Sequence, residues 1–367
     1  MASDQISELP DSLFEHILSF LPTKQAITTC LSSKRWSHLR WSLPILDVDD
    51  FNFHSLHSFL QYVDTIMSMR DHSETLRKFH LFLRSTNGNV PRVKINNWIN
   101  TAVDSKVEHV EIYDKTLNKF SIEIPPCIFN CNTISILKLS GVKVTAPSFI
   151  HLPSLKVLHL SKVIFPNIKF IYNLLYGCPL LQDLALKFCG TTDGYSVVPI
   201  NKGSLKNLVS ADVYDYPFTL ETLSNVRALR IDTIGFSSRL HPATFYNLIH
   251  MEIRYYSPDF SHITILECLQ NFPKLETLII IEFNGTEWLG ESVPECVSSH
   301  LKEFHLGNYR GLYNELELAR FIMKNASFLN IISIRGHVTL TENSKQEMLQ
   351  RLSSCPKSSV NCRLLFE

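Results

Sequence analysis

Acidic and histidine side chains gather early in the chain in spacings that metal sites use. Asp47, Asp49 and Asp50 form an acidic cluster whose oxygens could ligate a hard cation such as Ca²⁺. His54 and His57 have the spacing of half a zinc site, but no second pair follows at a suitable distance. We therefore interpret the acidic cluster as a solvated strand end and the histidine pair as ordinary packing, and we expect no metal.

Cysteine chemistry is the second candidate. The nine cysteines are Cys30, Cys127, Cys131, Cys178, Cys189, Cys268, Cys296, Cys355 and Cys362. Their odd number and scattered positions favour reduced and mostly buried thiols over a disulfide framework. The spacing Cys127-x3-Cys131 is again half a metal site without a partner pair, and we expect local packing to explain it. Nothing beyond composition supports a thiol nucleophile.

Other sequence signatures of catalysis are also missing. The chain has only 12 glycines among 367 residues, and we find no GxGxxG, GxxxxGK or GxSxG motif. Lys34 and Arg35 beside Trp36 could contact a phosphate, but a helix end with solvated charges explains them more simply. We therefore expect a protein without catalytic residues and without a cofactor.

Composition limits the partners. Lys+Arg and Asp+Glu both number 35, so the formal net charge is zero, which argues against nucleic acid or an anionic membrane as the main partner. Hydrophobic residues make up 45%, enough for a large core. The first residues have no basic and apolar signal pattern, and no apolar run approaches a spanning helix of about 18 residues. We expect a cytoplasmic or nuclear protein, or one found in both compartments.

An internal repeat is the strongest signal for the fold. Apolar residues spaced as LxxLxL occur twelve times, and their starts lie on average about 26 residues apart, within the leucine-rich-repeat range. The twelve units are Leu43-Leu46-Val48, Leu76-Phe79-Leu81, Val107-Val110-Ile112, Ile134-Leu137-Leu139, Leu155-Leu158-Leu160, Leu181-Leu184-Leu186, Leu208-Ala211-Val213, Val226-Leu229-Ile231, Leu248-Met251-Ile253, Leu275-Leu278-Ile280, Leu301-Phe304-Leu306 and Leu329-Ile332-Ile334.

The repeat predicts an α/β solenoid. The last two apolar positions of each unit are two residues apart, so both face inward on a short strand, and the strands stack into one parallel sheet. The step from Leu208 to Val226 is short and has room only for a turn, so we expect an irregular array. A short apolar helix is expected at Tyr172–Tyr176. An ordinary α/β domain with coincidental periodicity is the alternative.

The first 45 residues are helical instead. Leu13, Ile17 and Leu21 form one apolar line, joined by Phe14 and Leu18, until Pro22 ends the run. We expect Thr23 to cap a second helix through Cys30, and Ser32 or Ser33 to cap a third that carries Trp36 and Leu39. Three helices this small cannot bury these side chains among themselves, so part of their surface must meet a partner or the next domain.

These residues resemble a known family. Leu9-Pro10-Asp11, the segment from Ile17 to Thr23, Ser33-Lys34-Arg35-Trp36 and Leu43-Pro44-x-Leu46-Asp47 are similar to the F-box of plant F-box proteins with leucine-rich repeats. The resemblance implies that a Skp-type adaptor docks on this module. The residues implied in adaptor binding are Leu9, Pro10, Leu13, Ile17, Leu18, Leu21, Pro22 and Trp36.

The carboxy-terminal part resembles the FBD region of the same family. The similar segments are Val293-Pro294-Glu295-Cys296, Tyr309-Arg310-Gly311, Glu317-Leu318-Ala319, Lys324-Asn325-Ala326 and Ser353-Ser354-Cys355-Pro356. Two amphipathic helices are expected here, at 315–324 and at 344–352 with Asn343 or Ser344 as cap. We expect an F-box at 1–45, repeats at 46–290, and at 291–367 an FBD-like α/β cap that closes the solenoid and contacts substrate.

The repeats offer a candidate binding face. The residue between the last two apolar positions of each unit faces outward on the concave side of the predicted sheet. The polar residues we assign there to substrate binding are His80, Glu111, Lys138, His159, Asp212, Arg230, Glu252 and His305. Opposite charges alternate among them, which suits a polypeptide better than a polyphosphate.

The resemblance then implies a function. It predicts the substrate-recognition subunit of a Skp-cullin-F-box ubiquitin ligase, which binds the Skp-type adaptor and through it a cullin, and holds an unidentified target protein. No residue of this chain would perform covalent chemistry. Two alternatives stay open: a repeat scaffold or small-molecule co-receptor that engages no ligase, and a hydrolase hidden in the solenoid.

Overall fold

A computed structural model describes residues 9–32, 34–70, 74–84, 90–116, 122–192, 205–214, 220–232, 244–254, 265–283 and 292–367. The chain forms two compact units, which are described separately. The first unit comprises residues 1–181 and 188–195, and the second comprises 182–187 and 196–367.

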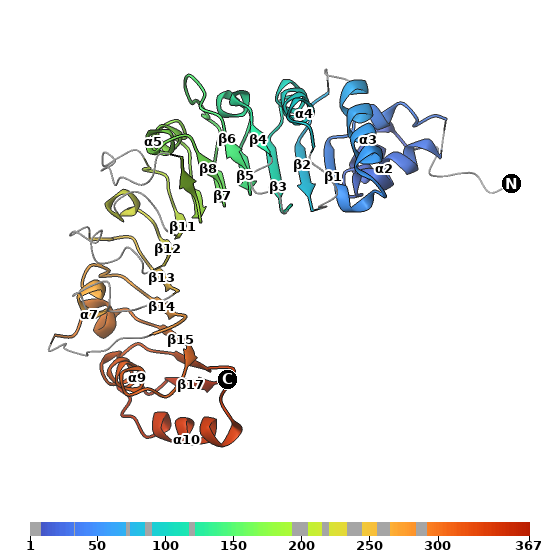
Figure 1. The fold of residues 1–367 in the computed structure, drawn as a ribbon. Coiled ribbons are helices and arrows are strands. Elements are labelled where there is room, and N and C mark those ends of the chain that lie inside the picture. The colour runs from blue at the N-terminus through green and yellow to red at the C-terminus, as the bar shows by residue number, and fades with distance from the viewer. Residues whose placement is uncertain are drawn as a thin grey trace. The chain divides into compact units, whose positions relative to one another are not determined.

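Parallel strands run through both units (Figure 1). In the first unit, neighbouring strands follow the order β1 Ile45–Asp49, β2 Lys78–Leu83, β3 His109–Asp114, β5 Ile136–Ser140 and β7 Val157–Ser161. In the second unit, the order is β9 Asp183–Lys187, β11 Ser210–Tyr214, β12 Ala228–Ile231, β13 His250–Ile253, β14 Thr277–Ile280, β15 Glu303–Tyr309, β16 Ile331–Gly336 and β17 Arg363–Phe366.

The repeat pattern accounts for the core. Every apolar residue of the twelve LxxLxL units is buried, and each unit ends on one of the strands from β1 to β16. Equivalent positions are also paired across neighbouring strands: Leu46 lies opposite Phe79, and Phe79 opposite Val110. The predicted fold class is therefore confirmed: an α/β solenoid of leucine-rich repeats with a parallel sheet.

Helices return the chain between strands. The first unit has α3 Leu56–Met69, α4 Arg92–Asp104 and α5 Ile168–Tyr176, with 3-10 helices η2 Asp50–Asn52 and η3 Pro126–Asn130. The second unit has η4 Leu220–Leu223, α7 Ile265–Leu269, α8 Glu295–Ser299, α9 Tyr313–Asn325 and α10 Glu342–Ser353. Helices α3, α4 and α5 lie on one side of the first unit's strands (Figure 1).

Local sequence explains these helices. The Asn167 side chain caps α5 by accepting a hydrogen bond from the N–H of Phe170, and α5 contains the predicted apolar helix. In the described part of the short step after β11, residues 220–227, the helical structure is the single turn η4, and a turn was expected there. Helix α9 contains the predicted helix at 315–324. Helix α10 begins earlier than expected, so its cap is Thr341, whose hydroxyl accepts from the N–H of Ser344.

A second, smaller sheet was not predicted. Its strands are β4 Glu123–Ile124, β6 Lys143–Val144, β8 Ile164–Phe165 and β10 Gly190–Thr191. Gly141, Lys162 and Phe188 lie two residues after the last apolar position of their repeats, and all three have left-handed backbones with φ of 73°, 52° and 53°. This turn leads the chain into the second strand. Lysine and phenylalanine rarely adopt this conformation, so the repeated turn left little trace in residue types.

The amino-terminal module has two α-helices, α1 Asp11–Leu18 and α2 Thr23–Leu31. The expected third helix is instead a run of turns followed by the 3-10 helix η1 Leu39–Trp41. Serine and histidine in this segment are weak helix formers, and the Ser37 hydroxyl bonds the carbonyl of Lys34 locally. Its predicted cap Ser33 lies outside the described residues. Inside the module, the rings of Phe14 and Trp36 stack with centroids 3.8 Å apart.

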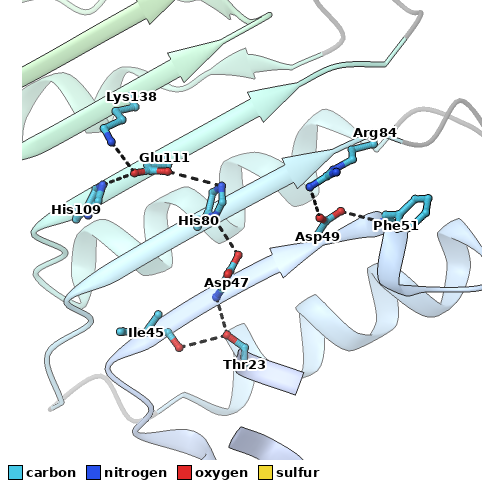
Figure 2. A network of polar contacts seen from close by, with 10 residues as sticks. All are labelled: Thr23, Ile45, Asp47, Asp49, Phe51, His80, Arg84, His109, Glu111 and Lys138. Atoms are coloured by element: carbon cyan, nitrogen blue, oxygen red, sulfur yellow. Dashed lines mark hydrogen bonds and ion pairs between the residues drawn. The ribbon is translucent and has the colours of Figure 1, made fainter. Parts of the chain in front are cut away.

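Thr23 does not cap α2 as expected. The N-cap is Pro22, and Thr23 is the first residue of the helix and is buried. Its hydroxyl instead accepts a hydrogen bond of 2.6 Å from the N–H of Asp47 and donates to the carbonyl of Ile45 at 3.4 Å (Figure 2). Strand β2 bonds to the residues of β1 that alternate with these two, since the N–H of Lys78 donates to the carbonyl of Pro44. The N–H of Asp47 and the carbonyl of Ile45 therefore lie on the edge of β1 that faces away from β2. Helix α2 therefore closes the first edge of the sheet.

Thr23→Val is expected to lower the free energy of unfolding by about 1–3 kcal/mol, because the part-buried N–H of Asp47 would lose its hydrogen-bond partner. Urea unfolding of the full chain measures this. The matched control is Thr28→Val on the same helix, whose exposed hydroxyl bonds only the carbonyl of Lys24, and its cost should be within about 0.5 kcal/mol of zero. Equal costs for both variants would refute the edge-closing role.

Candidate functional site

Helix α1 presents an apolar face to solvent. Leu13, Ile17 and Phe20 are exposed by 51%, 45% and 72%, and their spacing of four and then three residues places them on one side of the helix and its C-terminal turn. Phe14 and Leu18 each follow one of these exposed residues, so they lie on a neighbouring side of the helix, and both are buried. This is an unusual concentration of exposed apolar side chains, and such surfaces mark interaction sites.

The eight residues predicted to bind an adaptor fall into three groups by exposure. The exposed ones are Pro10, Leu13, Ile17 and Pro22, and the half-buried ones are Leu9 and Leu21. Leu18 and Trp36 are buried in the module. The structure therefore places two of the eight in the core and not on a surface.

Two exposed apolar residues of this module were missed by the prediction. Phe20 follows Ile17 by three residues, and this helical spacing was the signal that could have found it. Leu31, at the end of α2, is exposed by 61%. Leu21 was predicted in place of Phe20 because the pattern was extended as a regular helix, but α1 ends at Leu18.

A charged cluster fixes the start of α1. The Arg35 guanidinium donates to the carbonyl of Leu9 at 3.0 Å and lies 3.6 Å from the Asp11 carboxylate. Burial, with the nearby charges of Glu74 and Asp11, raises the pKa of the Glu15 carboxyl. The imidazole ring of His38 also approaches the Asp11 carboxylate, with its Nε2 atom 3.9 Å from it.

The outward residues predicted for substrate binding form a row in the first unit. The strand register places Asp47, His80, Glu111, Lys138 and His159 opposite one another on successive strands. The rings and carboxylates of this row interact directly (Figure 2): Asp47 and His80 are 2.9 Å apart, and His80 and Glu111 are 3.8 Å apart. The prediction that these residues share one face is confirmed.

Glu111 is the centre of this network. Its carboxylate lies 2.6 Å from Nε2 of His109 and 3.1 Å from Nζ of Lys138 (Figure 2). Burial raises the pKa of the Glu111 carboxyl, but the hydrogen bond from Lys138 and the surrounding positive charges outweigh it, so that pKa lies below its usual value. The hydrogen bond from His80 likewise lowers the pKa of Asp47. Both carboxylates are therefore held in their charged form.

Aromatic and basic side chains continue the same face towards the strand ends. The Phe82 ring lies 5.2 Å from that of Tyr113, and the Arg84 guanidinium and the Lys115 ammonium lie 4.2 Å and 5.1 Å from its centroid. Arg84 also pairs with Asp49 at 2.9 Å. This arrangement offers cation–π and apolar contacts beside the charged row.

The second unit carries its own row. Asp212, Arg230 and Glu252 lie opposite one another, followed by Ile279 and His305 on the next strands. Arg230 and Glu252 are 3.0 Å apart. The predicted residues of this unit thus also share one face, on which opposite charges alternate.

Asp212 is held by two cations that the sequence reasoning did not include. Nζ of Lys187 lies 2.6 Å from its carboxylate and Nη2 of Arg254 lies 2.5 Å from it. Burial raises the pKa of Asp212, but these hydrogen bonds outweigh it and keep that pKa below its usual value. Lys187 and Arg254 both lie two residues after an outward position, so the period-two alternation of strands was the signal for them.

The candidate metal residues have other partners. Asp49 accepts from the N–H of Phe51, and Asp50 accepts from the N–H of Arg84. Across the described ranges, no group of three or more His, Cys, Asp or Glu residues is placed to hold a metal ion. Cys127 donates to the side chain of Asn100 and Cys131 contacts Thr133.

Burial shifts the pKa values of several cysteine thiols in the direction opposite to that of an activated nucleophile. All nine cysteines are free and most are buried, as expected. Burial raises the pKa of Cys127 to about 11 and those of Cys178 and Cys296 to about 12. These thiols therefore stay protonated at neutral pH, and the thiolate is the reactive form.

Stability should fall on mild acidification because of the histidines on these faces. Burial lowers the pKa values of His109 and His250, so the fold favours their neutral form. As the pH falls through the usual value of about 6.5, the unfolded chain takes up these protons before the fold does, and the free energy of unfolding decreases. His250→Asn should reduce this decrease in urea unfolding between neutral and mildly acidic pH. A His250→Asn slope equal to that of the wild type would contradict the assignment.

Membrane insertion has no support from the helices. None that the structure describes combines the length and apolar character needed to span a bilayer.

Comparison with known families identifies three regions. Residues 6–39 match the F-box domain, residues 95–254 match the LRR repeats of the FBD-associated F-box protein At5g56370, and residues 290–334 match FBD. The F-box match contains α1, its exposed apolar face and α2, and the FBD match contains α8, β15 and α9.

Two relatives that match along the whole chain are named for the same three regions, and a third matches part of it. The chain is 27% identical to F-box/FBD/LRR-repeat protein At5g56420 of Arabidopsis thaliana over 99% of both chains. It is 28% identical to F-box/FBD/LRR-repeat protein At4g26340 of the same plant, over 99% of this chain and 100% of that one. F-box/LRR-repeat protein 13 of Arabidopsis thaliana is 34% identical over 55% of this chain and 45% of its own length.

Proposed function

Because the chain belongs to the plant F-box/FBD/LRR-repeat family, we propose that it is the substrate-recognition subunit of a Skp-cullin-F-box ubiquitin ligase. F-box proteins generally act as substrate adaptors of such ligases, and an F-box implies binding of a Skp-type adaptor. The proposal extends this general role to the present chain, with a protein target held by its repeats and FBD region.

The observation that carries the proposal is the apolar face of α1. Leu13, Ile17 and Phe20 lie within the F-box match and are exposed, while their neighbours Phe14 and Leu18 already supply the core. These three side chains are therefore available to a partner without any rearrangement of the module. An apolar centre of this kind is the usual anchor of a protein interface.

The open faces of the sheets support a protein target. The rows around Glu111 and Asp212 alternate acidic and basic side chains whose charges are mutually neutralised. Such a surface selects partners by complementary charge and does not attract polyanions in general. The aromatic pair of Phe82 and Tyr113 adds an apolar contact to it.

The mechanism that follows is proximity. A target bound to the repeats is kept near the conjugating enzyme that the cullin brings, so the effective concentration of its lysines is raised. Family members of this kind are typically non-catalytic adaptors. We place the protein in the cytoplasm, the nucleus or both, where its ligase partners would be met.

Direct binding tests the proposal. The purified full chain is mixed with a purified plant Skp-type adaptor and analysed by size-exclusion chromatography with light scattering. A stoichiometric complex is the expected result, and separate elution of the two proteins at micromolar concentrations would overturn it. Copurification of a cullin through the adaptor, seen only when the adaptor is present, completes the test.

A second function is favoured by one contact. Because Thr23 closes the edge of β1, the F-box helices also serve as the amino-terminal cap of the repeats. In a scaffold or small-molecule co-receptor without a ligase, this capping would be their whole role. Substitutions on the exposed face of α1 would then change no binding, whereas Thr23→Val would lower stability in either case.

A further inference from the structure

The two edge strands of the repeat array differ in whether their outer backbone groups have hydrogen-bond partners. At the first edge, the Thr23 hydroxyl takes the free backbone groups of β1. At the last edge, β17 pairs with β16 on one side, and in the part of the chain that the structure describes no strand lies on the other. Unpaired strand edges are templates for pairing with another chain.

The register shows which backbone groups of β17 are available. Arg363 N–H donates to the carbonyl of Asn330, and Glu367 N–H likewise donates to the strand β16. In a parallel ladder, alternate residues turn both backbone groups towards the same neighbour. The N–H and C=O groups of Leu364 and Phe366 therefore point away from β16, along the outer edge.

The side chains of β17 alternate between the two faces. Leu364 and Phe366 lie opposite Ile332 and Ile334 and extend the apolar core, but they are only half-buried because no further strand among the described residues pairs with β17. Leu365, exposed by 47%, lies on the open face. The edge thus has two core-facing apolar side chains that are only partly covered, as well as unpaired backbone groups.

We propose that two copies of this chain dimerise by pairing their β17 strands antiparallel about a two-fold axis at Leu365. Leu364 of one copy then lies opposite Phe366 of the other, and each such pair exchanges two N–H···O=C hydrogen bonds through the outward groups. Leu365 lies beside Leu365 of the other copy on the open face. The two half-buried apolar rows complete one another.

Charge complementarity selects this register. With Leu365 at the axis, Arg363 of each copy lies opposite Glu367 of the other, so the dimer has two favourable cross-strand pairs. Moving the axis by one residue to Leu364 places Arg363 opposite Leu365, so the two charge pairs are lost. The interface is isologous and closes at two copies.

The ion pair that Glu367 makes within its own chain does not prevent its pairing with Arg363 of the other copy. Its Oε2 lies 3.2 Å from the Arg335 guanidinium, and both side chains are largely exposed, so this pair contributes little stability. The joined edges are short and bury less surface than a standard interface. The dimer is therefore weak, and the chain is monomeric when dilute.

Charge reversal in the full chain tests the proposal by sedimentation velocity. The wild-type mass should rise from 42.1 kDa towards twice that value as the concentration increases from micromolar to millimolar. Arg363→Glu and Glu367→Arg each place like charges opposite one another twice, and each should dimerise at least about tenfold more weakly. An equal mixture of these two variants restores both pairs, and it should form a heterodimer at least as tightly as the wild type.

Two controls separate this edge from other surfaces. Arg335→Ala removes the pair within the chain, and Phe20→Asp changes the apolar face of α1, so both should dimerise like the wild type. A wild type that stays monomeric, single reversals that dimerise normally, or a mixture that stays monomeric would each overturn the proposal. The test requires no ligase component and is independent of the proposed function.

Discussion

A chain that carries Ile17→Asp together with Phe20→Asp is expected to bind a Skp-type adaptor about 100-fold or more weakly than the wild type. Each substitution replaces an exposed apolar side chain of α1 by a carboxylate that would have to be desolvated in the interface. Central apolar anchors contribute about 2 kcal/mol or more each, so the loss of two exceeds a factor of 100. Isothermal titration calorimetry with the purified adaptor measures the change.

Val93→Asp is the matched control for this double variant. Val93 lies on α4 in the same unit and is 69% exposed, so its substitution adds the same charge at a surface outside the F-box match. It should bind the adaptor like the wild type. Since Ile17 and Phe20 are not part of the core, both proteins should keep the wild-type thermal transition. Adaptor binding by the double variant at wild-type strength would remove the main support for the ligase role.

The amino-terminal module shows what helical periodicity can and cannot predict. The apolar spacing correctly predicted an amphipathic helix with Leu13 and Ile17 on one line. It did not show where the helix ends, and the end decides whether Phe20 or Leu21 continues that line. The apolar spacing also did not show which apolar residues face the core. Leu18 and Trp36 belong to the same motif as the exposed residues, and yet they are buried.

The repeats were predictable to the level of individual strand pairs. An apolar residue at every second position can be buried only in one register, so the LxxLxL units specified the strands as well as their alignment. The second sheet and β17 were not predictable in this way. The second sheet depends on left-handed turns at Lys162 and Phe188, and β17 follows the last repeat without a preceding apolar position of the same spacing.

The ion pairs of the open faces were only half predictable. The residue between two inward positions must face outward, and the sequence therefore located Glu111 and Asp212 on the correct faces. Their partners His109, Lys187 and Arg254 lie two residues before or after such positions. His109 reaches a carboxylate on its own strand, and Lys187 and Arg254 reach one on another strand. Whether such contacts form depends on the rotamers, which no sequence pattern specifies.

Phe79→Ala is expected to lower the free energy of unfolding of the first unit by about 3–5 kcal/mol, the usual cost of removing a buried phenylalanine. Phe79 is 1% exposed and lies opposite Leu46 and Val110, in the apolar row that continues through successive strands. A cavity at this point would remove packing contacts with both neighbouring repeats, because each strand buries its inner face against the next. Urea unfolding followed by circular dichroism measures the loss.

Phe82→Ala in the same strand β2 is the matched comparison, because the two residues have the same side chain on opposite faces of the sheet. Phe82 is half-exposed and contacts Arg84, Tyr113 and Lys115 on the open face, so its removal leaves no internal cavity and should cost about 1 kcal/mol. Equal costs at Phe79 and Phe82 would contradict the assignment of one face to the core and the other to recognition. A large difference would instead mean that Phe82 is free to be used for binding, since the fold depends little on it.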